Sequence, residues 1–239
     1  MLGNLFKNKK MKAKNHSVSV LYMLFSILFC VCLIAANVFE TKQFAFFGRS
    51  QTGGLIVFPI SYIINDVVSE VWGFRKARLL IWTGFIMNFF FVGLGALCDL
   101  LPAATYWDNA EGFHSIFGLA PRIALASFAA FICGSFVNAY VMSKMKVRDG
   151  QKRFTLRAIL STILGETTDS IIFFPLAFLG IVPAGELLWI MLVQVLLKTA
   201  YEIIILPLTI RIVAWVKKHE QTDVYDNDIS YSIWKLFDL

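Results

Sequence analysis

Three apolar stretches of the sequence each carry a pair of ionisable side chains three or four residues apart, namely Asp66 and Glu70, Glu166 and Asp169, and Lys198 and Glu202. Residues at this spacing share one face of a helix. Carboxylates on such a face can accept hydrogen bonds from a donor-rich ligand, bind a cation or relay protons. Because an Asp, Lys or Arg at the centre of a membrane span costs about 2.5–3.5 kcal/mol on insertion scales, these pairs indicate a function by default.

More polar side chains continue these faces. The first stretch also holds Ser61, Asn65 and Ser69, which are spaced by four, so one flank of its helix is polar for about three turns. The third stretch has Gln194 four residues before Lys198. A surface of this kind cannot face lipid, so it faces the interior of a helix bundle or a water-filled cavity.

Acids outnumber bases within these stretches. Lys198 is the one clear base, while Arg122 and Arg211 lie nearer to helix ends. The acids are Asp66, Glu70, Glu166, Asp169 and Glu202. Ion pairing between helices would need a better balance, so the pattern predicts a site for a cation or for a ligand rich in hydrogen-bond donors. Ion-pair scaffolding between helices is the alternative.

Composition places these residues in a membrane protein. The chain has 239 residues, of which 58% are hydrophobic and 16% charged, whereas a soluble domain averages about 45–50% apolar and about 25% charged. A soluble domain, a disordered chain and a coiled coil are therefore excluded. The apolar segments predict an all-α membrane protein with six transmembrane helices, at residues 18–39, 54–71, 79–101, 123–142, 156–182 and 187–216.

Positive charges predict the orientation of these helices. Lys and Arg cluster before the first segment and after the second, fourth and sixth, so the positive-inside rule places both termini in the cytoplasm. The net charge of +6 is then explained by orientation and not by nucleic-acid binding. We expect a basic N-terminal segment at 1–17, a membrane domain at 18–216, and a C-terminal tail at 217–239 that either docks on the membrane surface or is disordered. Carboxylates on the second helix of each half also suggest a 3+3 inverted repeat.

The sequence offers no signal for a metal, a cofactor or an enzyme. Its four cysteines form no CxxC or Cys/His ligand pattern, so we expect no metal site and no cofactor. His16, His114 and His219 lie outside the apolar segments, which argues against an intramembrane serine protease. An aspartyl protease would need Asp66 and Asp169 to share one site, but the glycines usual beside such aspartates are missing. A channel is a further alternative without a recognisable filter motif.

The ordered set of polar residues resembles the queuosine precursor transporter family, also called the vitamin uptake transporter family. The matching positions extend over most of residues 30–210, and they are Ala36, Asn37, Lys42, 58–61, Asn65, Asp66, Ser69, Glu70, Trp72, Gly73, Arg122, Ile123, Ala126, Ser127, Gly165, Glu166, Asp169, Ser170, Lys198, Tyr201, Glu202 and Pro207. The sequence departs from the family pattern at Ser135 and Asn138, where Gln and Asp are expected. This departure puts a contact from the fourth helix in doubt or indicates a changed substrate.

The resemblance implies a multi-pass protein of the bacterial inner membrane, surrounded by lipid, that imports 7-deazapurine bases for tRNA modification. The substrates would be 7-cyano- or 7-aminomethyl-7-deazaguanine, or queuine. The predicted substrate-binding residues are Asn37, Asn65, Asp66, Glu70, Arg122, Glu166, Asp169, Gln194, Lys198 and Glu202. The exact base, the energy coupling and a homo-oligomeric state stay open.

The chemistry of these residues suits such a base. A guanine-like edge presents two parallel N–H donors, which one carboxylate can accept, and Asp66 or Asp169 is the candidate. Lys198 or an amide would donate to the base oxygen. Stacking on an aromatic ring is worth about 1–3 kcal/mol per base elsewhere. The candidate rings are Phe58, Tyr62, Trp72 and Phe173.

Two related functions remain as alternatives. The first is a membrane-embedded substrate-binding subunit of an ATP-driven vitamin importer, but the first helix, with Ser26, Cys30 and Ala36, lacks the Ala-xxx-Ala motif expected for docking. The second is a transporter of another purine-like solute.

Overall fold

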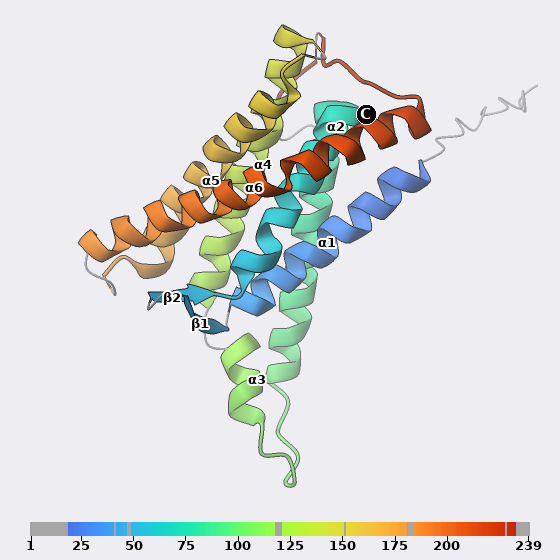
Figure 1. The fold of residues 1–239 in the computed structure, drawn as a ribbon. Helices are drawn as coiled ribbons and strands as arrows, with labels where there is room; N and C mark the ends of the chain where they lie inside the picture. Colours follow the sequence, from blue (N-terminus) through green and yellow to red (C-terminus); the bar gives the residue numbers. More distant parts are fainter. Residues whose placement is uncertain are drawn as a thin grey trace, which may run out of the picture.

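The computed structural model describes residues 19–40, 42–46, 49–117, 121–150, 152–180, 184–227 and 229–232. Within these residues the chain forms six α-helices and one short β-hairpin (Figure 1). The helices are α1 Val20–Glu40, α2 Gly54–Asp99, α3 Ala110–Phe117, α4 Pro121–Asp149, α5 Phe154–Phe178 and α6 Ala184–Glu220. The predicted segment 1–17 lies outside the described residues.

Five helices of the described part are long and apolar enough to cross a membrane, namely α1, α2, α4, α5 and α6. Four of them coincide with predicted segments, at 18–39, 123–142, 156–182 and 187–216. The all-α prediction is thus confirmed for the membrane helices. Both the hairpin, formed by β1 (Gln43–Phe46) and β2 (Arg49–Thr52), and the short helix α3 were not expected from the sequence.

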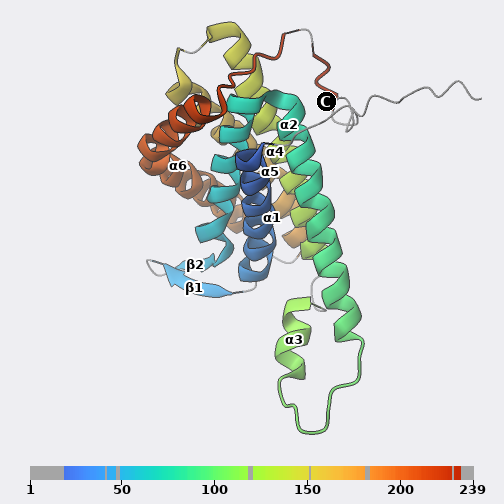
Figure 2. The same ribbon diagram turned by 90° about the vertical axis from the view of Figure 1, so that its right-hand side faces the viewer.

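Helix α2 contains the second and third predicted segments together. A continuous helix of its 46 residues would be about 69 Å long, more than twice the roughly 30 Å of a bilayer core. Gly73 breaks it, with φ 80° and ψ 174°, a conformation open essentially to glycine alone. Figure 2 shows the two arms, residues 54–72 and 74–99, running in opposite directions from this turn. The basic loop expected after residue 71 is therefore helical except at Gly73.

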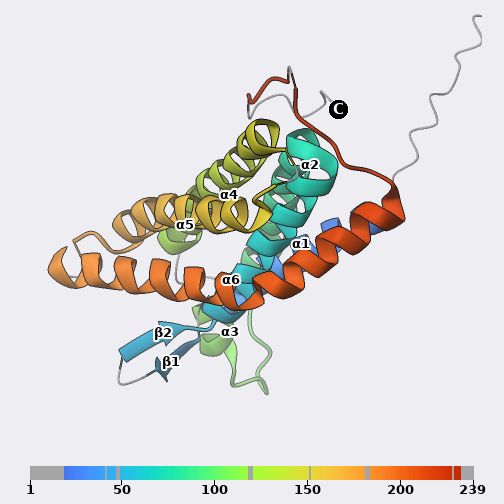
Figure 3. The ribbon, with the colours of Figure 1, turned by 45° about the horizontal axis from the view of Figure 1, so that its top comes forward.

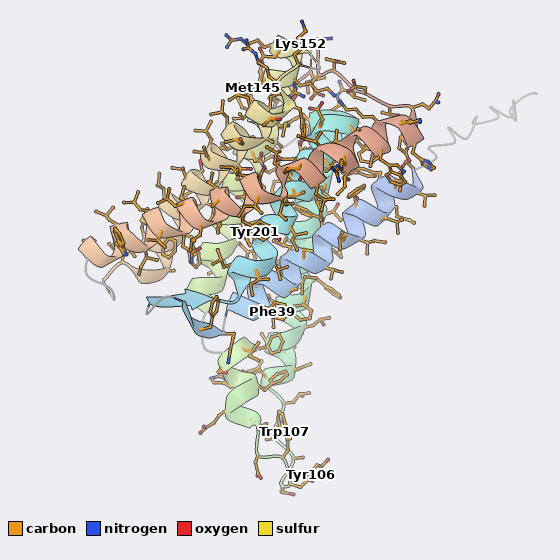
Figure 4. The ribbon with its side chains drawn as sticks, viewed as in Figure 1. Phe39, Tyr106, Trp107, Met145, Lys152 and Tyr201 are labelled. Atoms are coloured by element: carbon orange, nitrogen blue, oxygen red, sulfur yellow. The ribbon has the colours of Figure 1, made fainter. Side chains whose placement is uncertain are left out.

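The molecule has two distinct ends. Figure 4 shows Met145 and Lys152 toward one end, which we call the inner end, and Tyr106 and Trp107 at the opposite, outer end. Helix α3 and the loop before it project at the outer end (Figures 1 and 2). The Gly73 turn lies at the inner end, where the chain reverses (Figure 2).

The helices pack around α2 and α5. Helix α2 contacts α1, α4 and α6, and α5 contacts α4 and α6, as Figure 3 also shows for α4, α5 and α6. The closest crossing is between α4 and α5, since a Cβ atom on Gly134 would lie 2.8 Å from the carbonyl oxygen of Gly165. Tyr62 of α2 is fully buried against the same crossing. Gly134, which has no side chain, permits this close approach.

After α6 the chain returns over the inner end, and we call residues 222–227 and 229–232 the strap. The amide of Val224 donates to the carbonyl of Val71 at 3.1 Å, and the amide of Phe74 donates to Asp226 Oδ2 at 2.9 Å. These two bonds flank the Gly73 turn on both sides. The described part of the tail therefore packs on the helices, which the sequence left undecided.

Candidate functional site

A pocket lies toward the outer end, between the last turns of α1 and α5 and the first turns of α2 and α6. It has about 460 Å³ of empty space, part of it open to the outside. Its lining residues are Ala36, Asn37, Gly54, Leu55, Phe58, Asp169, Phe173, Phe174, Gln194 and Lys198. Four predicted site residues thus line one pocket, together with two of the predicted aromatic rings.

Lys198 joins the pocket to two carboxylates on α5. Its Nζ lies 2.8 Å from Glu166 Oε2 and 3.4 Å from Asp169 Oδ2. The same ammonium lies 4.3 Å from the centre of the Phe58 ring, within range of a cation–π contact. All three charged groups are buried, so the attraction is only weakly screened by water. Because one cation faces two carboxylates, these carboxylates can accept further hydrogen bonds from donor groups of a ligand.

Helical spacing brings these side chains together. Asp169 follows Glu166 by three residues on α5, and Lys198 follows Gln194 by four on α6, so each pair shares one face. Asn37 comes from the last turn of α1 and Phe58 from the first turns of α2. The pocket therefore offers a carboxylate, an ammonium, two amides and aromatic rings from four helices.

Asp66 and Glu202 form a second acidic group, deeper than the pocket. The Glu202 carboxyl is the closest charged neighbour of Asp66, and the Asn138 amide lies beside it. Asp66 is 0% exposed and Glu202 2%. Within the described residues, neither oxygen of Asp66 has a hydrogen-bond donor. We call these two residues the buried acid pair.

Glu70 lies apart from the pocket, in an ion cluster at the inner end. Its carboxylate lies 2.6 Å from Arg157 Nη2 and 2.6 Å from Lys217 Nζ, with Lys146 Nζ at 3.9 Å. Asp223 of the strap completes the cluster, because it lies 2.5 Å from Lys146 and 2.9 Å from Lys217. The cluster therefore ties α2, α4, α5, α6 and the strap together.

This cluster corrects the charge balance expected from the sequence. Three bases that the sequence assigned only to orientation face Glu70, so Lys198 is not the one base among the buried acids. Of the other buried acids, Glu166 and Asp169 face Lys198, while Asp66 and Glu202 form no ion pair within the described residues. An acidic surplus remains, but it is smaller. No local signal identifies Arg157 as a partner of Glu70, since the two are 87 residues apart.

The remaining predicted residues lie outside the pocket. Asn65 donates from Nδ2 to the carbonyl of Ser135 at 3.2 Å, which links α2 to α4. Arg122 lies in the first turn of α4, and its side chain is outside the described residues. Ser135 and Asn138, the positions at which the resemblance led us to expect a departure from the family pattern, are both buried against α2. The departure therefore lies in the layer behind the pocket.

Of the four predicted aromatic residues, some line the pocket and others lie outside it. Phe58 and Phe173 line the pocket. Tyr62 is buried at the crossing of α4 and α5, and Trp72 packs edge-on against Tyr22 at 5.5 Å between ring centres. Of the four candidates, two are therefore placed to stack on a ligand.

Sequence comparison connects this architecture to known proteins. Residues 52–212 match the family described as "Putative vitamin uptake transporter". The chain belongs to this family. It is 33% identical over 177 residues to the "Probable queuosine precursor transporter" of Bacillus subtilis (strain 168), covering 73% of this chain and 76% of that protein. It is 24% identical over 156 residues to the "Queuosine precursor transporter" of Escherichia coli (strain K12), covering 64% of this chain and 66% of that protein.

A third relative is the "Probable queuosine precursor transporter" of Haemophilus influenzae (strain ATCC 51907 / DSM 11121 / KW20 / Rd), 24% identical over 132 residues and covering 55% of this chain and 54% of that protein. No solved structure matches the chain. The predicted resemblance is thus confirmed, and the vitamin uptake transporter family is one of transporters and not of enzymes. The matched range extends from the end of β2 into α6, so it contains every predicted site residue except Asn37.

Proposed function

We propose that this chain imports 7-deazaguanine bases, the precursors of queuosine, across the bacterial inner membrane. The observation that carries this proposal is the pocket that joins Asp169, Lys198, Asn37, Gln194 and Phe58 in a family with relatives named queuosine precursor transporters.

The base would bind by three kinds of contact. The Asp169 carboxylate accepts the ring N–H and the exocyclic amine of the guanine edge, in the paired geometry that carboxylates favour. Lys198 or Gln194 donates to the oxygen of the base. Phe58 and Phe173 stack on its ring, each contributing about 1–3 kcal/mol by analogy with other base-binding proteins. A cationic amine on the base would be matched by Glu166.

The same proposal includes six membrane crossings with both termini in the cytoplasm. The two arms of α2 supply two antiparallel crossings, and α1, α4, α5 and α6 supply the others. The inner end carries the basic residues of the positive-inside pattern, including Lys152 in Figure 4. The pocket then faces the periplasm, from which a precursor would enter.

The test is uptake in a bacterial strain that can neither synthesise queuosine precursors nor import them. The strain expresses this protein, receives nanomolar 7-cyano-7-deazaguanine, 7-aminomethyl-7-deazaguanine or queuine, and its tRNA is assayed for queuosine. We expect one base to restore queuosine, and Asp169→Asn and Lys198→Ala to abolish the restoration. Asp108→Asn, in the exposed loop at the outer end, is the matched control.

Two results would contradict the proposal. If no base restores queuosine although the protein is found in the membrane, the substrate is another solute. If the bases are imported equally well by Asp169→Asn and Lys198→Ala, the pocket is not the binding site.

A further inference from the structure

The buried acid pair lacks a counter-ion. In the described residues, each buried cation has partners other than this pair. Lys198 contacts Glu166 and Asp169, Lys146 and Arg157 contact Glu70, and Arg78 donates to the carbonyl oxygens of Ser230 and Ser232. No base of these residues lies within 4 Å of Asp66 or Glu202, and the polar neighbours of Asp66 are the uncharged Asn138 amide and the Glu202 carboxyl itself. The pair therefore differs from the pocket and from the inner ion cluster, where each carboxylate faces a cation.

Two adjacent carboxylates without a cation cannot both stay charged away from water. Transfer of even one unpaired charge into a dry interior costs several kcal/mol, and like charges at one site disfavour each other further. The other titratable groups that face the pair are Tyr62 and Glu70 on α2 and Glu166 on α5, with Asn138 as the neutral neighbour on α4. None of these supplies a positive charge. The simplest way to neutralise the pair is a bound proton.

The pair lies between the pocket and the inner end. Glu202 is four residues beyond Lys198 on α6, and Asp66 is four residues before Glu70 on α2, so each is one helical turn, about 6 Å, from its neighbour. Tyr201, which precedes Glu202, lies midway between the two ends in Figure 4. A line of acidic groups thus connects the pocket to the ion cluster through the pair.

We propose that Asp66 and Glu202 form a proton-binding site through which one proton moves inward with each imported base. The inference rests on the proposed function, because it concerns how the same transporter is driven. In the closed arrangement the pair is dry and keeps its proton. When α2 and α6 separate at the inner end, water reaches the carboxyl groups, the charged form becomes favourable and the proton leaves to the cytosol.

The test uses the purified full chain in liposomes and tritiated 7-cyano-7-deazaguanine, a base without a cationic side chain. Counterflow against unlabelled base at equal pH measures transport alone. Accumulation with pH 7.5 inside and pH 6.5 outside, at zero membrane potential, measures coupling. With one proton per base, the wild-type protein is expected to concentrate the base up to about tenfold, because one pH unit is a tenfold ratio of proton activity.

Asp66→Asn and Glu202→Gln keep the size of the side chains but cannot exchange a proton. We expect both variants to retain counterflow and to lose accumulation, with an inside-to-outside ratio near one. Asp108→Asn removes an exposed carboxylate from the outer loop and should keep both activities. A pH dye inside the liposomes adds a measurement on the wild-type protein alone, which should show acidification when base is added.

Each contrary outcome has a distinct meaning. Accumulation by Asp66→Asn and Glu202→Gln at the wild-type ratio would show that the pair has only a packing role. Wild-type counterflow without accumulation or acidification would overturn the coupling and leave the proposed function standing. If the wild-type protein shows no counterflow with any of the three precursor bases, the proposed function fails and the inference fails with it. Should both variants misfold, the dye measurement on the wild-type protein still tests the coupling, and absence of acidification would overturn the proposal.

Discussion

At the scale of single residues, the pocket depends on one ammonium between two carboxylates. Lys198 lies 2.8 Å from Glu166 and 3.4 Å from Asp169, and all three are buried. A buried ion pair contributes little net stability, but removal of one partner leaves an uncompensated charge. Lys198 therefore has two separable roles, since it neutralises the acids in the empty pocket and offers a donor to the base.

We expect Lys198→Ala to destabilise the protein by about 3–5 kcal/mol, the usual cost of breaking a buried pair. Adding Glu166→Gln to the same chain should restore part of this loss, because it removes one of the stranded charges. Thermal unfolding of the three proteins in detergent measures both effects. Lys218→Ala, at an exposed position near the end of α6, is the control and should leave the melting temperature unchanged. Equal melting temperatures for Lys198→Ala and wild type would contradict the ion-pair account.

Phe58 gives a second prediction at this scale. Its ring lines the pocket and lies under the Lys198 ammonium at 4.3 Å. Phe58→Ala should weaken binding of the base about 5- to 150-fold, which corresponds to a lost stacking energy of about 1–3 kcal/mol. Binding of labelled base to the purified protein measures this change. Phe90→Leu, on the exposed surface of α2, should bind normally, and equal affinities for all three proteins would exclude stacking on Phe58.

Several of the residues that the sequence singled out lie together in the structure. Asp169, Gln194 and Lys198 were selected because polar groups at helical spacing cannot face lipid, and Asn37 was selected from the family resemblance. All four line the pocket. Glu70 was selected by the same rule, yet it faces bases from α4, α5 and α6. Periodicity within one helix reveals a polar face but not its partner, because the partner is set by packing between distant segments.

At the scale of elements, the Gly73 turn divides α2 into two arms that run in opposite directions. The sequence indicated two helices separated by a loop, and the loop is a single residue with φ 80°. The segment after Gly73 continues as a helix because Arg75, Lys76, Ala77 and Arg78 are good helix formers. The hairpin of β1 and β2 and the helix α3 were missed because they are only four and eight residues long.

Gly73→Ala tests this turn. The backbone there is open essentially to glycine alone, and an added Cβ would lie 2.7 Å from Asp226 Oδ1. We expect a loss of at least about 1–3 kcal/mol of stability from backbone strain. Gly93→Ala in the same helix is the matched control, because its Cβ would meet nothing within 4 Å, and alanine should stabilise a helix interior by about 0.5–1 kcal/mol. A Gly73→Ala protein as stable as Gly93→Ala would contradict this prediction.

At the scale of the whole molecule, the outer and inner ends are built differently. The pocket at the outer end is partly open, whereas the inner end is closed by the strap and by the ion cluster around Glu70. The strap is held by further bonds, because Arg78 donates to the carbonyl oxygens of Ser230 at 3.2 Å and Ser232 at 2.7 Å. The sequence could not predict this closure, since Phe74 and Asp226 are 152 residues apart.

Asp226→Ala should loosen the inner end. Asp226 accepts hydrogen bonds from the Phe74 amide and from Ser143, and a hydrogen bond to a charged group is worth about 1.5–3 kcal/mol. We expect faster amide hydrogen exchange at residues 71–78, measured by mass spectrometry, and little change in α3. Asn227→Ala, at the exposed neighbouring position, is the control. Unchanged exchange at Phe74 in Asp226→Ala would show that the strap does not hold the turn.

The strap also has a consequence for biosynthesis. The ribosome makes Phe74 152 residues before Asp226, which at about 5–20 residues per second is a delay of roughly 8–30 s. During that time the two arms of α2 are held by helix packing alone, because the Phe74 amide cannot yet donate its hydrogen bond to Asp226 of the strap. The inner end is therefore completed last, after α6 has been synthesised, and the nascent protein passes through an interval in which its inner end is not yet closed by the strap.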